Sequence, residues 1–247
     1  MPRRSAQIPF GEVFRRVWTV RRMRKQIYAW AAGFAAYTLV IPFAIITLKN
    51  GYGLSDYQAL SFSLSIVAGG ILAGVVNGII ADRVGPRPLF VVYMLLLTVI
   101  ALYWAFAPSR FFILPTAAAF FFAGYAKAGI LVVSNHYFLN ASDSSDRVGA
   151  SMFLRIISGA VAGLIGAVIG GGILALLNGM GLSGVTIYRF YFRIAVAIMF
   201  MLVPLVVRLD RLDEWRIRDA LVLLVRPKRI IRMRRERHIG VGANDES

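Results

Sequence analysis

The stretch that decides the fold is Gly78–Arg87, which reads GIIADRVGPR. An apolar run that begins near Tyr57 precedes it, and a second apolar run begins at Leu89 directly after it. Both runs are long enough to cross a bilayer, which takes about 20 residues of helix. A turn between two spans commonly carries a few basic residues, but this one holds an acid beside a base, then a glycine, then a second base. The stretch therefore predicts a membrane protein in which this turn has a specific role.

The whole chain has the composition of a membrane protein. Of its 247 residues, 58% are hydrophobic and only 16% are charged, whereas about a quarter of an average soluble domain is charged. Backbone groups in lipid must be satisfied within their own segment, so long apolar runs are expected to be helices. The fold class is thus predicted to be all-α integral membrane, with six transmembrane helices. The spans are expected at roughly 27–48, 57–81, 89–107, 111–137, 148–177 and 187–207.

The basic residues indicate how the chain lies in the membrane. The net charge is +16, and 22 of the 28 Lys and Arg residues fall in residues 1–26, in the 82–88 turn, at Arg147 and in residues 208–247. Cytoplasmic loops carry an excess of Lys and Arg, so both termini are expected to be cytoplasmic, in a plasma membrane or cell inner membrane. The positive charge is then expected to meet the lipid surface, and nucleic acid is not an expected partner.

The chain offers no pattern typical of an enzyme. It has no cysteine and only two histidines, which excludes disulfides and thiolate chemistry and leaves no cluster of metal ligands. It also contains no nucleophile motif and no glycine-rich phosphate loop. We expect no catalytic residue, no metal and no cofactor.

Four segments can be separated along the chain. Residues 1–26 are predicted to form a basic, amphipathic cytoplasmic segment, and residues 27–207 the six-helix transmembrane domain. Residues 208–225 repeat the amphipathic pattern, so both ends of the domain are expected to carry interfacial helices. These ends either anchor the chain at the membrane surface or dock another membrane chain. Residues 226–247 are basic and polar and are expected to be disordered.

Glycines recur at helical spacing in two of the spans. Small residues on one face let membrane helices pack closely. They serve either ordinary packing within the bundle or a moving surface between two bundles. The candidate packing residues are Gly70, Gly74 and Gly78 in the second span, and Gly159, Gly163, Gly166 and Gly170 in the fifth.

Two cations, Lys127 and Arg155, lie inside spans. A charge facing lipid at the centre of a helix costs about 2.5–3.5 kcal/mol, so both are expected to face protein or water. No span interior contains an acid, which suggests an anionic or amphiphilic ligand. The alternative is that both side chains snorkel to the interface. Further candidates for a substrate cavity are His136, Asn77 and Asn135; His136 could relay a proton or be an ordinary interfacial residue.

The turn resembles the signature loop between the second and third helices of a six-helix half in the major facilitator superfamily. The positions that match are Gly78, Ala81, Asp82, Arg83, Gly85 and Arg87. Ile80 stands where leucine is usual, and Pro86 stands where arginine is common. The resemblance implies a secondary transporter that works by alternating access. It also implies a gating role for Gly78, Asp82, Arg83, Gly85 and Arg87, with Asp82 reaching across to another half.

The family usually has twelve spans in two halves, whereas six are expected here. The basic, amphipathic entry Pro9–Gln26 is similar to the cytoplasmic linker that leads into the second half, so the chain resembles the C-terminal half. The resemblance implies a small-molecule substrate and a second six-helix half, supplied by a homodimer or by a separate chain. The halves of such transporters are related by an axis along the membrane normal, which permits either arrangement. The alternative is a truncated half that does not transport and acts as a membrane scaffold or is a gene remnant.

Overall fold

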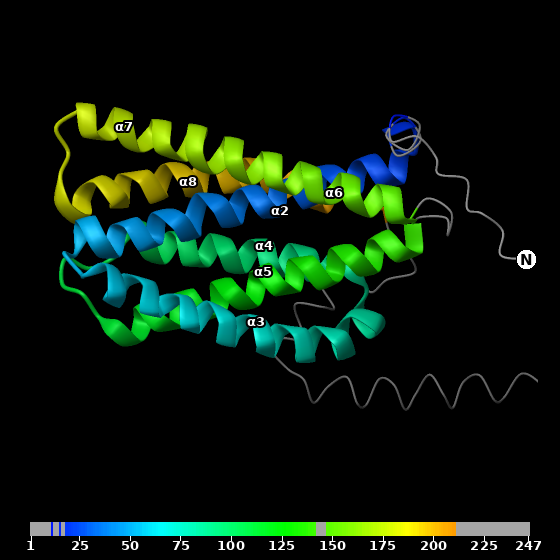
Figure 1. Cartoon of the computed structure of the whole chain (residues 1–247), viewed down its shortest axis with the longest axis horizontal. Helices are drawn as coiled ribbons and strands as arrows, with labels where there is room; N and C mark the ends of the chain where they lie inside the picture. Colours follow the sequence, from blue (N-terminus) through cyan, green and yellow to red (C-terminus); the bar gives the residue numbers. More distant parts are fainter. Residues whose placement is uncertain (1–10, 12–14, 16–17, 142–146, 211–247) are drawn as a thin grey trace, which may run out of the picture.

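The computed structural model describes residues 11, 15, 18–141 and 147–210, and every regular element in them is a helix (Figure 1). The helices, in chain order, are α2 (Arg21–Ile46), η1 (Thr47–Gly51), α3 (Asp56–Val84), α4 (Pro86–Ala105), α5 (Ile113–Ala141), α6 (Arg147–Val161), η2 (Ala162–Gly170), α7 (Gly171–Gly179) and α8 (Gly184–Val207). The elements η1 and η2 are π-helical turns that continue the preceding α-helices. Most of the two expected amphipathic segments, and all of residues 226–247, lie outside the described residues.

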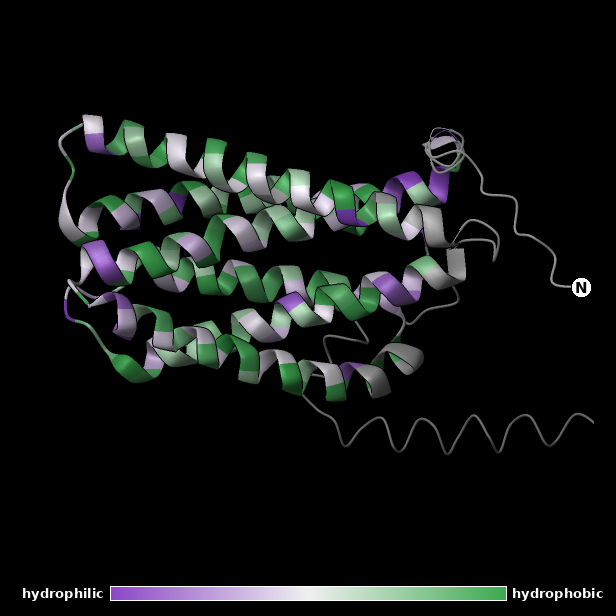
Figure 2. Cartoon of the chain, viewed as in Figure 1, coloured by the Kyte–Doolittle hydropathy of each residue, from purple (hydrophilic) through white to green (hydrophobic). Residues whose placement is uncertain are grey.

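Six helical segments are long and apolar enough to cross a membrane, as the sequence predicted. They contain between 20 and 31 residues, and Figure 2 shows that apolar residues cover most of their length. The fifth span is made of α6, η2 and α7 together. The bundle therefore has an N-terminal end, where α2 begins and α8 ends, and a far end, where α7 ends and α8 begins.

Helix α2 lies at the centre of the bundle and contacts α4, α5, α6, η2 and α8. Helix α4 packs between α5 and α8, and α3 packs mainly against α5. Figure 1 shows α3 and the α6–α7 span at opposite margins of the bundle, with the other helices between them. In this arrangement, α3 and the fifth span have the smallest buried fractions of the six spans.

The crossing of α3 and α5 depends on two glycines. A Cβ atom at Gly69 would lie 1.9 Å from the carbonyl oxygen of Phe121, and one at Gly124 would lie 2.0 Å from that of Ile66. No side chain fits at either position, so the two backbones touch directly. This close approach is how membrane helices gain packing energy when lipid supplies no hydrophobic driving force between them.

The turn between α3 and α4 is shorter than the sequence predicted. A loop was expected over residues 82–88, but α3 continues through Val84 and α4 begins at Pro86. Gly85 alone makes the turn, with a φ of 87° that favours glycine. Pro86 suits the first helical position because its missing N–H would have no partner there. The expected loop boundaries were wrong because a glycine followed by a proline changes the chain direction in one residue.

Candidate functional site

The seam between α2 and α5 holds a charged side chain well inside the bundle. Lys127 lies 14 residues from the start of α5, which is about 20 Å at 1.5 Å per residue. Its Nζ atom lies 4.7 Å from the centre of the Tyr37 ring. A cation over an aromatic face is attracted by the ring, and the attraction is about 2 kcal/mol when the pair is desolvated. Tyr37 therefore orients Lys127 toward α2.

The space beside Lys127 is small. It measures about 10 Å³ and is lined by Gly33, Phe34, Tyr37, Lys127 and Ile130. A space of this size holds about one water molecule. A larger ligand at Lys127 therefore needs this seam to open, or needs a second surface that completes a cavity with it.

Polar atoms continue along the same seam toward the N-terminal end. The Gln26 amide donates a hydrogen bond from Nε2 to the carbonyl oxygen of Ser134, at 2.9 Å. Three other buried polar atoms of these residues and of their neighbour Trp30 have no hydrogen-bond partner within the described part of the chain, namely Gln26 Oε1, Trp30 Nε1 and Ser134 Oγ. A buried polar group without a partner costs about 1–3 kcal/mol, so such a cluster is typical of a place where water or a ligand binds.

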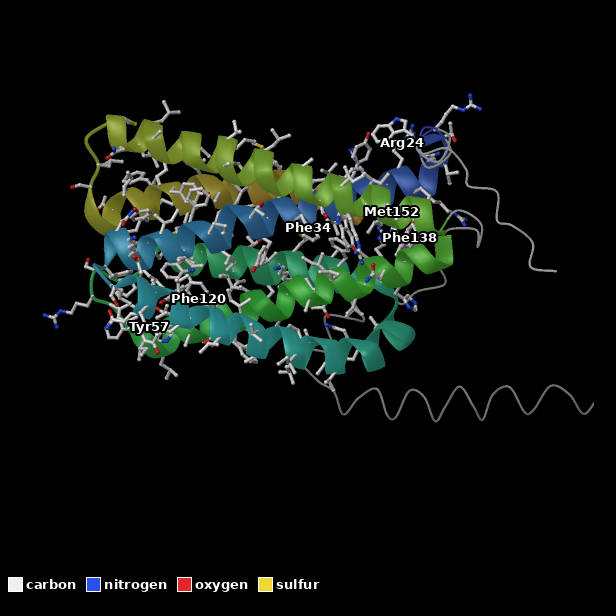
Figure 3. All side chains as sticks on the ribbon, viewed as in Figure 1. Arg24, Phe34, Tyr57, Phe120, Phe138 and Met152 are labelled. Carbon is white, nitrogen blue, oxygen red and sulfur yellow. The ribbon has the colours of Figure 1, made fainter. Side chains whose placement is uncertain are left out.

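A small apolar cluster covers this polar group and is separate from the main core. It joins α2, α5 and α6 through Trp30, Phe138 and Leu154, with Phe34 and Ile157 packed against it. Figure 3 labels Phe34 and Phe138, which mark the seam toward the N-terminal end. We define the α2–α5 seam as Gln26, Trp30, Gly33, Phe34, Tyr37, Lys127, Ile130 and Ser134.

The other residues proposed for the cavity lie elsewhere. Arg155 is exposed on α6 and is not among the residues that line the space beside Lys127. Asn135 is exposed and His136 is half-buried. Asn77 is fully buried on α3, where its Oδ1 atom accepts a hydrogen bond from the Tyr93 hydroxyl of α4. The structure does not bring these four residues together around Lys127, and the role of Lys127 in a substrate cavity stays a prediction.

Sequence reasoning missed most of the seam. Gln26, Trp30 and Tyr37 recur at intervals of four and seven residues on α2, and Lys127 and Ser134 are seven apart on α5. Residues at such intervals share one face of a helix. That periodicity was the available signal, although it does not say which two helices face each other.

The signature turn is tied to the end of α8. The Arg87 guanidinium donates a hydrogen bond from Nη2 to the carbonyl oxygen of Val207, at 2.5 Å. Lys25 and Asp210 form an ion pair at the same end of the bundle. The side chains of Asp82 and Arg83, and any contact of Gly78, lie outside what the structure describes. The gating role of these residues stays a prediction.

The glycines singled out for packing have different surroundings. Gly166 and Gly170 pack on α2, where added Cβ atoms would meet Thr38 at 3.6 Å and the Phe43 ring at 2.4 Å. Gly70 is in loose contact with α5. Added Cβ atoms at Gly74, Gly159 and Gly163 would meet nothing within 4 Å in this chain. These last three are available to a surface outside the chain.

Comparison with known proteins gives the family. A family model described as the Major Facilitator Superfamily matches residues 5–236, which include all six spans and the signature turn. Searches of curated proteins and of solved structures found no match to this chain. The six apolar helices fit a half-size domain of such a transporter. The chain thus belongs to the Major Facilitator Superfamily, and it is an integral membrane protein of a transporter family.

Proposed function

We propose that this chain is one six-helix half of a secondary transporter. It works by alternating access with a second six-helix half, and a small anionic or amphiphilic molecule binds at the α2–α5 seam. Transport rather than catalysis is supported by the family, whose members are transporters. The basic end of the bundle, with Arg21, Arg87 and Arg208, faces the cytoplasm of a plasma or cell inner membrane under the positive-inside rule.

The observation that carries the proposal is the position of Lys127. It is half-buried in mid-span, and neither α2, α5 nor α6 contains an acidic residue. A half-buried cation in mid-span is stabilised by a counter-charge or a polar partner, because its charge is partly desolvated. The Tyr37 ring supplies part of this stabilisation through its contact with the cation. An anionic substrate supplies the rest when it binds.

The seam also has features that suit an aromatic or amphiphilic anion. Phe34 and Tyr37 present rings beside the cation, and apolar walls with a few polar groups are typical of small-molecule sites. The unpaired atoms of Gln26, Trp30 and Ser134 can add hydrogen bonds to the substrate or to its water shell. Because the present space is small, the seam opens or the second half completes the cavity when the substrate binds.

Exposed apolar surfaces at the margins of the bundle support the proposal of a second half. Large apolar side chains are exposed along α3, including Leu64, Val67 and Ile71, and along the fifth span, including Leu164 and Val168. Gly74, Gly159 and Gly163 leave open space on the same two helices. Such surfaces suit close contact with another helical bundle. The partner is a second copy of this chain or a separate six-helix chain.

Binding of benzoate tests the site. Full-length protein purified in detergent is titrated with radiolabelled benzoate, a small aromatic anion. Lys127→Gln is expected to weaken binding by at least about tenfold, since a hydrogen bond to a charged group contributes about 1.5–3 kcal/mol. The matched control is Arg155→Gln, which removes a charge from the exposed face of α6. Equal benzoate affinity of the Lys127→Gln variant and the unmodified protein would show that Lys127 holds no substrate.

Mass measurement tests the second half. The protein is extracted from its native membrane and weighed in detergent, alone and with any chain that remains bound. A twelve-span assembly that takes up benzoate in proteoliposomes supports transport by two halves. A stable assembly that neither binds nor transports anions supports a scaffold role for a non-transporting half instead.

A further inference from the structure

A second pocket lies at the far end of the bundle, away from the seam. It has a volume of about 490 Å³ and lies among η1, α7, α8 and the connection between α7 and α8. Figure 1 shows this connection at the end of the bundle opposite the start of α2. Small-molecule sites in proteins commonly have volumes of about 300–1,000 Å³. The far-end pocket is therefore large enough for a ligand, unlike the space beside Lys127.

The lining of the far-end pocket changes from polar to apolar with depth. Asn178 and Ser183 lie at its mouth, where α7 ends and α8 begins. Leu174 and Gly171 lie deeper along α7, which puts Gly171 about 10 Å below Asn178 at 1.5 Å per residue. This gradient follows that of a lipid leaflet, in which polar headgroups overlie hydrocarbon chains.

The start of α8 supplies hydrogen-bond donors at the mouth. Ser183 precedes α8 and makes no capping hydrogen bond with its side chain, and the first turn of α8 has no acidic residue. The first N–H groups of a helix have no partner within it, and the helix dipole favours an acceptor there. Asn178 adds an amide group, and the Asn50 side chain is hydrogen-bonded to Tyr188, which also lines the pocket. The ligand that fits carries hydrogen-bond acceptors at its polar end.

Charge plays little part in this pocket. None of the described residues that line it is charged. Lys49, next to Asn50 in the chain, forms an ion pair with Asp56 at 2.7 Å. Neutral donors therefore bind the acceptors of the ligand. The affinity of the pocket is expected to depend little on the net charge of the headgroup.

We propose that the far-end pocket binds a phospholipid from the adjoining leaflet. The phosphodiester and ester oxygens lie toward Asn178, Ser183 and the start of α8, and the upper part of an acyl chain lies along Leu174 and Ile187. This lipid fills the space between the end of α7 and the start of α8. It therefore stabilises the packing of these two helix ends. The site is independent of the anion site proposed at Lys127.

Two neighbouring glycines provide a matched test. Gly171 lines the pocket and Gly172 does not, and an added Cβ atom at either position would meet nothing within 4 Å. Gly171→Leu fills the pocket, whereas Gly172→Leu adds the same side chain on another face of the helix. Full-length protein in detergent is titrated with dihexanoyl phosphatidylcholine below its micellar concentration, and bound lipid is counted by native mass spectrometry.

The expected result is one bound lipid for the unmodified protein and for Gly172→Leu. Gly171→Leu is expected to bind about tenfold more weakly, with benzoate binding unchanged. Dihexanoyl phosphatidylglycerol is expected to bind as well as the choline lipid, with little dependence on salt. Should Gly171→Leu fail to insert, Ala175→Leu fills the same pocket and replaces it in the test.

Three results would overturn the proposal. Equal lipid binding by Gly171→Leu and Gly172→Leu would place the lipid outside the pocket. Full competition by glycerol 3-phosphate, which has the polar end without the chains, would identify a site for a free phosphate compound rather than a lipid. A strong preference for the anionic lipid would contradict recognition by neutral donors.

Discussion

Arg87 donates a hydrogen bond to the carbonyl oxygen of Val207 at 2.5 Å, so the first turn of α4 holds the last turn of α8. The final carbonyl groups of a helix have no partner within it, and a cation at that end is favoured by the helix dipole. The basic residue of the signature turn therefore has a role inside this half, in addition to any role toward a second half.

Replacement of Arg87 is expected to loosen the end of α8. Arg87→Gln should lower the free energy of unfolding by about 1 kcal/mol, near the lower end for a charged hydrogen bond because the site is partly exposed to solvent. Unfolding in mixed micelles with increasing SDS measures the change. Arg110→Gln, at an exposed arginine of the far end, is the control and should leave stability unchanged.

The crossing of α3 and α5 is expected to tolerate no side chain. Gly69→Ala places a Cβ atom within 1.9 Å of a backbone oxygen, so the helices must separate, at a cost of about 3 kcal/mol or more. Gly74→Ala adds the same methyl group to the same helix in open space. The two variants are compared by unfolding in SDS, and similar stabilities would show that the crossing is looser than the structure has it.

The hydrogen bond between Tyr93 and Asn77 links α4 to α3 inside the bundle. Tyr93→Phe removes the donor and leaves the buried Asn77 amide without it, which should destabilise the protein by about 1–3 kcal/mol. The added change Asn77→Leu removes the polar group as well and should restore part of the loss. A double-mutant cycle of unfolding free energies measures the coupling, and additive effects would contradict a direct bond.

The one-residue turn at Gly85 is expected to require glycine. Its φ of 87° lies in the left-handed region, where a Cβ atom costs about 1–2 kcal/mol. Gly85→Ala should therefore lower stability by that amount, while Gly172→Ala, in a regular part of α7, should not. The comparison is again made by unfolding in detergent. A neutral effect at Gly85 would mean that the turn relaxes to another backbone conformation.

Some features of this protein follow from the sequence alone. Six continuous apolar runs of sufficient length predict six membrane helices, because a helix satisfies its backbone groups within its own segment and barrel strands would be shorter and alternating. The GIIADRVGPR stretch indicates the family, which the match over residues 5–236 confirms. The place of Lys127 within a span also follows from the sequence, since it is a matter of counting residues.

Other features depend on which helices face each other, and only the tertiary structure decides that. The pairing of α2 with α5 brings Tyr37 over Lys127 and Gln26 against Ser134, although these pairs are far apart in the chain. The tightest glycine contact is made by Gly69 with α5, one residue away from the periodic series at Gly70 and Gly74. Sequence periodicity gives the face of one helix, but a contact is a property of two helices. Their crossing point and rotation are set by the packing of the whole bundle.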